Sequence, residues 1–318
     1  MAAGAERMKE AARSPSWPGP DGSAPAGAGP ERFQAFPVAM VVLAVTLFAL
    51  SDVVAKQLSA GLPAEQVVWL RFVPQIPLAL LLALRRKRPV IPARPAAQLL
   101  RGVAMLGAGE FFILGLHSLG VAEATAISFV TPAFVTLLAI PLLGERVGPH
   151  RWAALALGLA GVLVVVRPGA DAFQPAALLP AAAAFCGAAM AVITRRIAGT
   201  DSSETTLLCS AVVGFGLLSL SAPWWWTGFD LRLAGRAVAM GGLYAAGQYC
   251  LILAYSRGDA SLVAPFAYVQ VIVATGLGAV VFGHVPDAVS LGGIALIVAS
   301  GAYALHREGV ARLRPRRR

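Results

Sequence analysis

Charged residues are scarce in this chain. Asp, Glu, Lys and Arg make up 13% of its 318 residues, whereas they approach about a quarter of an ordinary soluble domain. Hydrophobic residues reach 58%, and the mean hydropathy is +0.72. So little charge cannot cover the surface of a water-soluble protein of this size. We therefore expect lipid to surround most of the chain.

Residue types that carry catalysis or bind metals are also few. The three cysteines and four histidines are scattered, without the spacing of metal ligands. The sequence contains no H-E-x-x-H, no G-x-S-x-G and no glycine-rich pattern that holds phosphates. We expect no metal site, no cofactor and no nucleotide hydrolysis. Two alternatives to transport stay open, namely an intramembrane enzyme and a structural membrane protein without transport activity.

Ten apolar runs are predicted to be transmembrane helices, because each approaches the ~20 residues that cross a bilayer core of about 30 Å. Residues 1–35 are rich in Ala, Gly, Pro and Ser and are predicted to be a disordered cytoplasmic tail. Residues 306–318 are expected to form a basic cytoplasmic tail. The runs cover residues 36–58, 64–84, 98–119, 121–143, 151–167, 176–197, 205–223, 236–256, 261–282 and 290–305.

An internal duplication organises these runs. Residues 118–166 recur as a diverged second copy at residues 256–305. We predict an all-α integral membrane protein with two five-helix repeats, at 36–167 and 176–305, the second inverted because five is an odd number. Repeats of this kind around a central site are typical of transporters. The matching glycines are Gly120 with Gly258, Gly144 with Gly283, and Gly161 with Gly301.

The basic residues predict the orientation, since Lys and Arg concentrate in cytoplasmic loops. Most of the 26 fall on the side of the two tails, and the opposite side holds only Arg167, Arg232 and Arg236. Both termini are thus predicted to be cytoplasmic. The net charge of +10 is expected to meet anionic lipid and not nucleic acid. The loop after the second run carries the largest internal group: Arg85, Arg86, Lys87, Arg88, Arg94 and Arg101.

Four short motifs stand out beside the duplication. They are Ser-Asp-Val-Val-Ala-Lys at 51–56, Trp-Leu-Arg-Phe at 69–72, Ala-Thr-Ala-Ile-Ser-Phe-Val-Thr-Pro at 124–132, and Leu-Gly-Glu-Arg at 143–146 followed by Gly158 and Gly161. Together they resemble the EamA-like branch of the drug/metabolite transporter superfamily, over about residues 38–305. The second copy departs from the first, because His284 stands in place of Glu145 and Val271 in place of Pro132.

The resemblance implies a ten-helix carrier of a bacterial inner membrane, with a cavity that opens alternately to each side. Since nucleotide hydrolysis is not expected, an ion gradient must supply the energy, and we expect protons. Similar carriers move S-adenosylmethionine, riboflavin and metallophores, so the resemblance implies a small metabolite as substrate, including ring-bearing ones. The chain is expected to be a monomer or a homodimer.

Ionisable side chains inside spans are expensive and therefore mark candidate sites. Asp52 and Lys56 lie four residues apart on one helical face, and Arg71 in the next span should lie at a similar depth. Two cations against one carboxylate would suit an anionic or zwitterionic substrate. The alternatives are a buried structural lock between the first two spans, or a Lys56 side chain that reaches to the membrane surface.

Glu110 lies midway along the third predicted span, among the small residues Gly107, Ala108 and Gly109. An isolated carboxyl group there can take up and release a proton, so Glu110 is the predicted coupling residue. The alternative is a neutral Glu110 that hydrogen-bonds to a neighbouring helix.

The second half offers neutral polar groups instead of charges. The candidates are Tyr244, Gln248 and Tyr249 in the eighth span, and Tyr268 and Gln270 in the ninth. Their amides and phenols can bind and stack on a ring-bearing metabolite, or they can hydrogen-bond helix to helix. Thr131-Pro132 and Ala264-Pro265 mark expected helix breaks, which transporters often place at their sites. We therefore predict a symmetric scaffold with an asymmetric site.

Overall fold

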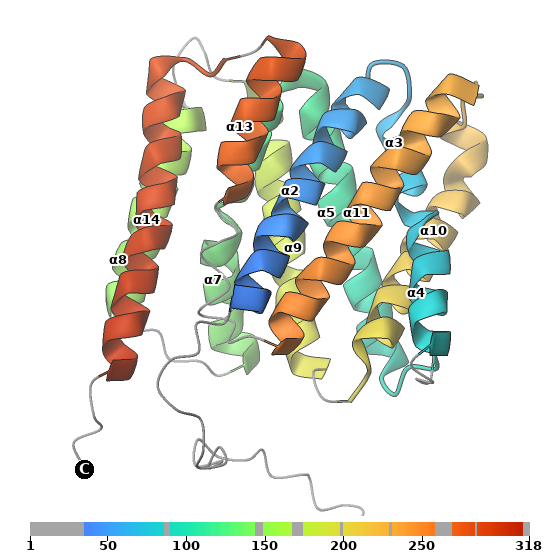
Figure 1. Ribbon diagram of the computed structural model, residues 1–318, viewed down its shortest axis with the longest axis horizontal. Helices are drawn as coiled ribbons and strands as arrows, with labels where there is room; N and C mark the ends of the chain where they lie inside the picture. Colours follow the sequence, from blue (N-terminus) through green and yellow to red (C-terminus); the bar gives the residue numbers. More distant parts are fainter. Residues whose placement is uncertain are drawn as a thin grey trace, which may run out of the picture. The chain divides into compact units, whose positions relative to one another are not determined.

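The computed structural model describes residues 35–85, 90–143, 149–166, 174–197, 200–228, 231–257, 269–283 and 285–313 (Figure 1). Every regular element in these ranges is a helix, which confirms the all-α prediction. The predicted N-terminal tail up to residue 34, the Ala264-Pro265 pair and Tyr268 lie outside the described residues. The helices are α2 (Ala35–Leu58), α3 (Ala64–Phe72), α4 (Gln75–Arg85), α5 (Pro95–Ser118), α6 (Val121–Ser128), α7 (Thr131–Leu143), α8 (Pro149–Val166), the short 3-10 helix η1 (Pro175–Ala177), α9 (Leu178–Ile197), α10 (Ser203–Trp225), α11 (Leu231–Arg257), α13 (Val269–Phe282) and α14 (Ala288–Leu313).

These helices follow the apolar runs closely, with two differences inside the runs. The second run is divided into α3 and α4, where Pro74 lacks the N–H that a continuous helix needs. The fourth run is divided into α6 and α7 at residues 129–130, just before Pro132. The last helix also continues to Leu313, beyond the predicted end at residue 305.

Six segments of the described chain are long and apolar enough to cross a membrane. They are α2, α3 with α4, α5, α6 with α7, η1 with most of α9, and α10. Shorter apolar stretches lie at Leu155–Val166, Val269–Phe282 and Ala288–Tyr303. The chain is thus a multi-pass membrane protein.

Proline and short polar side chains set where several helices begin. Pro95 is the first residue of α5, where a missing N–H costs nothing. Ser202 precedes α10 and accepts a hydrogen bond from the Thr205 backbone N–H at 3.1 Å. Asp287 does the same for α14, where its carboxylate accepts from the Ser290 N–H at 2.9 Å. Gly283 ends α13 with a φ of +65°, a conformation that favours glycine.

The helices pack in long pairs that join distant parts of the chain. α2 lies along α11, α5 along α9, and α8 along α14 (Figure 1). α10 packs against α3, α4 and α5, while α13 contacts α2 and α6. The main buried cluster contains side chains from most of these helices, including Leu58, Ile113, Ile127 and Met240.

Glycine permits the close approach of α8 and α14. A Cβ atom added at Gly161 would lie 2.8 Å from the Gly293 carbonyl oxygen, and one added at Gly293 would lie 2.8 Å from the Gly161 oxygen. Small residues at such a crossing let two backbones touch, which supplies dispersion contacts where lipid offers no hydrophobic driving force. The adjacent Gly292 is exposed, and nothing lies within 4 Å of a Cβ atom placed on it.

Substitution of Gly161 should therefore separate these two helices. Gly161→Leu is expected to lower the apparent melting temperature of the detergent-purified protein by several degrees, since overpacking costs about 1–3 kcal/mol. Gly292→Leu, the same change at an open position on the partner helix, should leave it nearly unchanged. Equal effects of the two substitutions would contradict the glycine crossing.

Candidate functional site

A cavity of about 300 Å³ lies among helices from both halves of the chain. Its size is at the lower end of the range for small-molecule sites. Eight of its lining residues precede residue 167, and five follow residue 176. The lining residues are Phe48, Asp52, Arg71, Ala108, Gly109, Phe112, Ser128, Thr131, Ala183, Gly187, Tyr244, Gln248 and Gln270.

Four helices each present two lining residues spaced four apart, which is about one turn. The pairs differ strongly in character. The pair on α9 is small, so this helix leaves space, and nothing lies within 4 Å of a Cβ atom added at Gly187. The other three helices supply the three aromatic rings and three of the polar side chains. The pairs are Phe48 and Asp52 on α2, Ala108 and Phe112 on α5, Ala183 and Gly187 on α9, and Tyr244 and Gln248 on α11.

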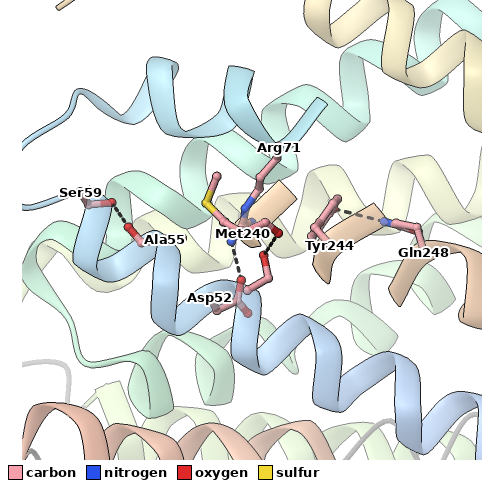
Figure 2. A network of polar contacts seen from close by, with 8 residues as sticks. Asp52, Ala55, Ser59, Arg71, Met240, Tyr244 and Gln248 are labelled. Atoms are coloured by element: carbon pink, nitrogen blue, oxygen red, sulfur yellow. Dashed lines mark hydrogen bonds and ion pairs between the residues drawn. The ribbon is translucent and has the colours of Figure 1, made fainter. Parts of the chain in front are cut away.

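A buried ion pair lies in this cavity wall. Arg71 Nη2 donates to Asp52 Oδ1 at 2.6 Å, and each side chain is only 6% exposed. Figure 2 shows the two side chains pointing toward each other from α2 and α3. Gln270 of α13 lies within hydrogen-bonding reach of the same carboxyl group. The predicted proximity of Asp52 and Arg71 is thus observed.

Tyr244 joins the ion pair to the second half of the chain. Its ring lies 5.0 Å from Arg71 Cζ, in a cation–π contact. The phenol oxygen accepts a hydrogen bond from Gln248 Nε2 at 3.2 Å (Figure 2). Phe48 packs on the same ring with centroids 5.3 Å apart. This residue therefore fixes both the guanidinium group and an amide beside the cavity.

The cavity wall also contains an unused hydrogen-bond donor and a helix break. Arg71 Nε is buried and has no partner among the described residues. At the break between α6 and α7, Ser128 and Thr131 line the cavity. Thr131 Oγ1 donates to the Ser128 carbonyl at 2.6 Å. Arg71 and an interrupted helix thus line the same cavity, and transporters often place such helix breaks at their sites.

Lys56 lies elsewhere. Its ammonium group donates to the backbone carbonyls of Leu116 and of Leu119, the latter at 2.8 Å. These carbonyls belong to the end of α5, where a cation also interacts favourably with the helix dipole. Lys56 is not among the lining residues, so the excess of positive charge expected beside Asp52 does not form.

Two further predicted site residues also lie outside the lining. Glu110 is half-buried on α5, and its Oε1 has no hydrogen-bond partner among the described residues. Tyr249 is half-buried on α11, one position from Gln248. The small residues Ala108 and Gly109, just before Glu110, do line the cavity, and so does Phe112. The face of α5 that carries these three residues is therefore turned toward the cavity.

Arg101 was counted with the basic residues that follow the second run, although it also falls within the third predicted span. Arg101 lies in the second turn of α5, where Nε donates to Thr194 Oγ1 at 2.7 Å and Nη1 donates to Ser210 Oγ. One turn earlier, Gln98 Nε2 donates to Asp201 Oδ2 at 2.8 Å. These bonds tie the start of α5 to α9 and α10.

The pocket residues that the prediction missed carry no charge. Phe48, Phe112, Ala183 and Gly187 look like ordinary residues of apolar spans, and only their neighbours in space reveal their role. Tyr244, by contrast, was among the polar residues named in the eighth span, and it lines the cavity one helical turn before Gln248. Among the described residues, no group of three or more His, Cys, Asp or Glu is placed to hold a metal ion.

Comparison with known proteins decides the family. The model of the EamA-like transporter family matches residues 35–167. A riboflavin transporter of Rhizobium johnstonii is 33% identical over 281 residues, which cover 84% of this chain and 90% of the relative. The chain belongs to the EamA-like transporter family. The resemblance to the drug/metabolite transporter superfamily is thereby confirmed, and this EamA-like protein is a membrane transporter.

Other similar proteins broaden the range of substrates within the family. An S-adenosylmethionine uptake transporter of Rickettsia felis is 27% identical and covers 84% of this chain and 91% of its own length. A pseudopaline exporter of Pseudomonas aeruginosa is 26% identical, with 86% and 97% covered. A protein of known crystal structure shares the fold with a TM-score of 0.66 and 22% identity, covering 88% of this chain and 99% of its own.

The two interpretations of the ion pair, structural lock or substrate contact, make different predictions. Asp52→Asn should lower the stability of the EamA-like protein by about 3–5 kcal/mol, because it leaves Arg71 buried and uncompensated. Adding Arg71→Gln removes the remaining charge and should restore much of that stability. Thermal unfolding of the wild type, both single variants and the double variant in detergent measures the coupling.

Transport by the same variants separates the two roles. If the pair contacts substrate, the double variant should regain stability while transport stays at least about tenfold reduced, since polar groups that bind substrate are lost. Recovery of both stability and transport would show that the pair is only a lock.

Proposed function

We propose that this protein is a secondary active transporter that moves a small organic metabolite across the bacterial cytoplasmic membrane by alternating access. The observation that carries the proposal is the cavity lined from both halves of the chain, with a buried ion pair in its wall. A site at the seam between two halves becomes accessible from either side when one half rocks against the other. The related transporters of known substrate support a metabolite as cargo.

We propose further that the chain forms ten spans in two inverted repeats, with both termini in the cytoplasm. The helix contacts support this arrangement. If each span is exchanged with the one five places along, the α2–α11 pair becomes the α9–α5 pair, and the α2–α13 contact becomes the α9–α7 contact. The α3–α11 contact likewise becomes the α10–α5 contact, while the pairs α8–α14 and α6–α13 map onto themselves. A two-fold relation between the halves accounts for all of these contacts.

A proton gradient is the proposed source of energy. The supporting feature is Glu110, midway along α5, whose buried Oε1 has no partner among the described residues. A carboxyl group without a fixed ion pair can gain and lose a proton as its surroundings change. Glu110 lies outside the cavity lining, but it shares α5 with Ala108, Gly109 and Phe112, so its protonation can act on the cavity through this helix.

Filling the cavity should stop transport without unfolding the protein. Gly187→Leu places a side chain into open space beside α9 and should reduce the uptake of radiolabelled substrate into proteoliposomes by at least about tenfold, because the cargo no longer fits. Labelled riboflavin and labelled S-adenosylmethionine serve as the first probes. The Gly187→Leu protein should keep the wild-type melting temperature.

The matched control is Gly276→Leu on α13. Gly276 also has nothing within 4 Å of an added Cβ atom, but it does not line the cavity. Its substitution should leave uptake within about twofold of the wild type, in keeping with the small effect of open surface positions. Full uptake by Gly187→Leu would contradict the assignment of the cavity as the substrate site.

Proton coupling is tested at Glu110. Glu110→Gln keeps the shape of the side chain but cannot carry the proton, so an imposed pH gradient should no longer drive accumulation in proteoliposomes. Exchange of labelled for unlabelled substrate at equal concentrations should persist, since it needs no gradient. Accumulation at the wild-type level in Glu110→Gln would remove this residue from the coupling mechanism.

A further inference from the structure

The charge balance of the cavity differs from the one that the sequence suggested. Among the described residues that line it, Asp52 and Arg71 are the charged ones, and they neutralise each other at 2.6 Å. Lys56, the other cation expected here, is held by the carbonyls at the end of α5. The described wall of the cavity therefore carries no net charge.

This balance limits what can bind. A cation or an anion that leaves water for a buried site loses its hydration, and it regains that energy only from a countercharge. Here the countercharges are already engaged with each other. A charged cargo would have to divide the Asp52–Arg71 pair, whereas an uncharged cargo leaves it intact.

The shape and composition of the wall favour a flat ring. Phe48, Phe112 and Tyr244 bring three aromatic rings to a cavity of about 300 Å³. On the α9 side the lining residues Ala183 and Gly187 are small, which leaves room for a flat molecule to lie against this helix. Aromatic side chains gain most from another ring that stacks on a face or meets an edge.

The polar groups match the edge of such a ring. Arg71 Nε is a buried donor that lacks a partner among the described residues, and an unpaired buried donor is costly until an acceptor arrives. Gln248 and Gln270 add amide groups that both donate and accept. Carbonyl oxygens and ring nitrogens of a heteroaromatic compound would satisfy these groups without bringing a charge.

We infer that the cavity selects an uncharged, planar heteroaromatic ring with carbonyl or ring-nitrogen acceptors at its edge, and rejects cations and anions of similar size. This inference rests on the proposed function, because it names the cargo of the same site. It also replaces the anionic or zwitterionic substrate that the sequence predicted.

Three probes separate these classes in proteoliposomes. Riboflavin is uncharged and carries a flat three-ring system; riboflavin 5′-phosphate adds an anionic group to the same ring; S-adenosylmethionine carries a net positive charge. We expect uptake of labelled riboflavin, with unlabelled riboflavin competing at least about tenfold better than either charged probe. Equal or better uptake of S-adenosylmethionine or the phosphate would overturn the inference while leaving the transporter function standing. Failure of all three to move would overturn the proposed function itself.

A single charge placed in the cavity should change the selection. Gln248→Glu adds a carboxylate of nearly the same shape, so the preference should shift by about tenfold or more toward the cationic S-adenosylmethionine. Gln57→Glu on the exposed face of α2 is the matched control and should not change the ratio of the two competitors. An unchanged ratio in a folded Gln248→Glu protein, or an equal change in both variants, would contradict a cavity selected by charge balance.

Discussion

The arrangement of the cavity depends on one constraint, which is that Asp52 and Arg71 are charged and buried together. Each side chain is 6% exposed, so neither group keeps the hydration that it has in water. Their contact holds α2 beside α3, and Tyr244 of α11 covers the guanidinium group from the other half of the chain. Gln270 of α13 completes the surroundings of the carboxyl group. Four separate helices therefore converge on a single neutral pair.

The helices around this pair contribute different kinds of side chain to the cavity. α2 and α11 lie side by side and supply two rings, one amide and the carboxylate, whereas α9 supplies Ala183 and Gly187 and thereby the free volume. α5 and α11 occupy corresponding places in the proposed repeats, yet they present Ala108 and Phe112 on one side and Tyr244 and Gln248 on the other. In the proposed duplicated scaffold the cavity is therefore asymmetric. Such asymmetry suits a cargo with two different faces or edges.

Much of the fold was predictable because lipid imposes a simple pattern. Apolar runs of about 20 residues mark the spans, and the helices begin and end near the predicted limits. The helix break near Thr131-Pro132 was also predicted, since proline interrupts backbone hydrogen bonding. The break at Pro74 was missed because the mean hydropathy of the run is high enough for one continuous span. Hydropathy records the solvent of a segment but not the continuity of its helix.

The sequence by itself determined that this chain lies in a membrane, that it is built of helices and that its first half carries the intramembrane charges. It also predicted that Asp52 and Arg71 lie close together, since two buried charges of opposite sign at similar depth are stabilised when they pair. Only the tertiary structure decided which groups share the cavity. It placed Lys56 on the carbonyls at the end of α5, gave Arg101 its partners Thr194 and Ser210, and gave Gly187 its open space. The physical reason is that a hydrogen bond or a free volume depends on which helix lies opposite, and no local pattern of residues records that.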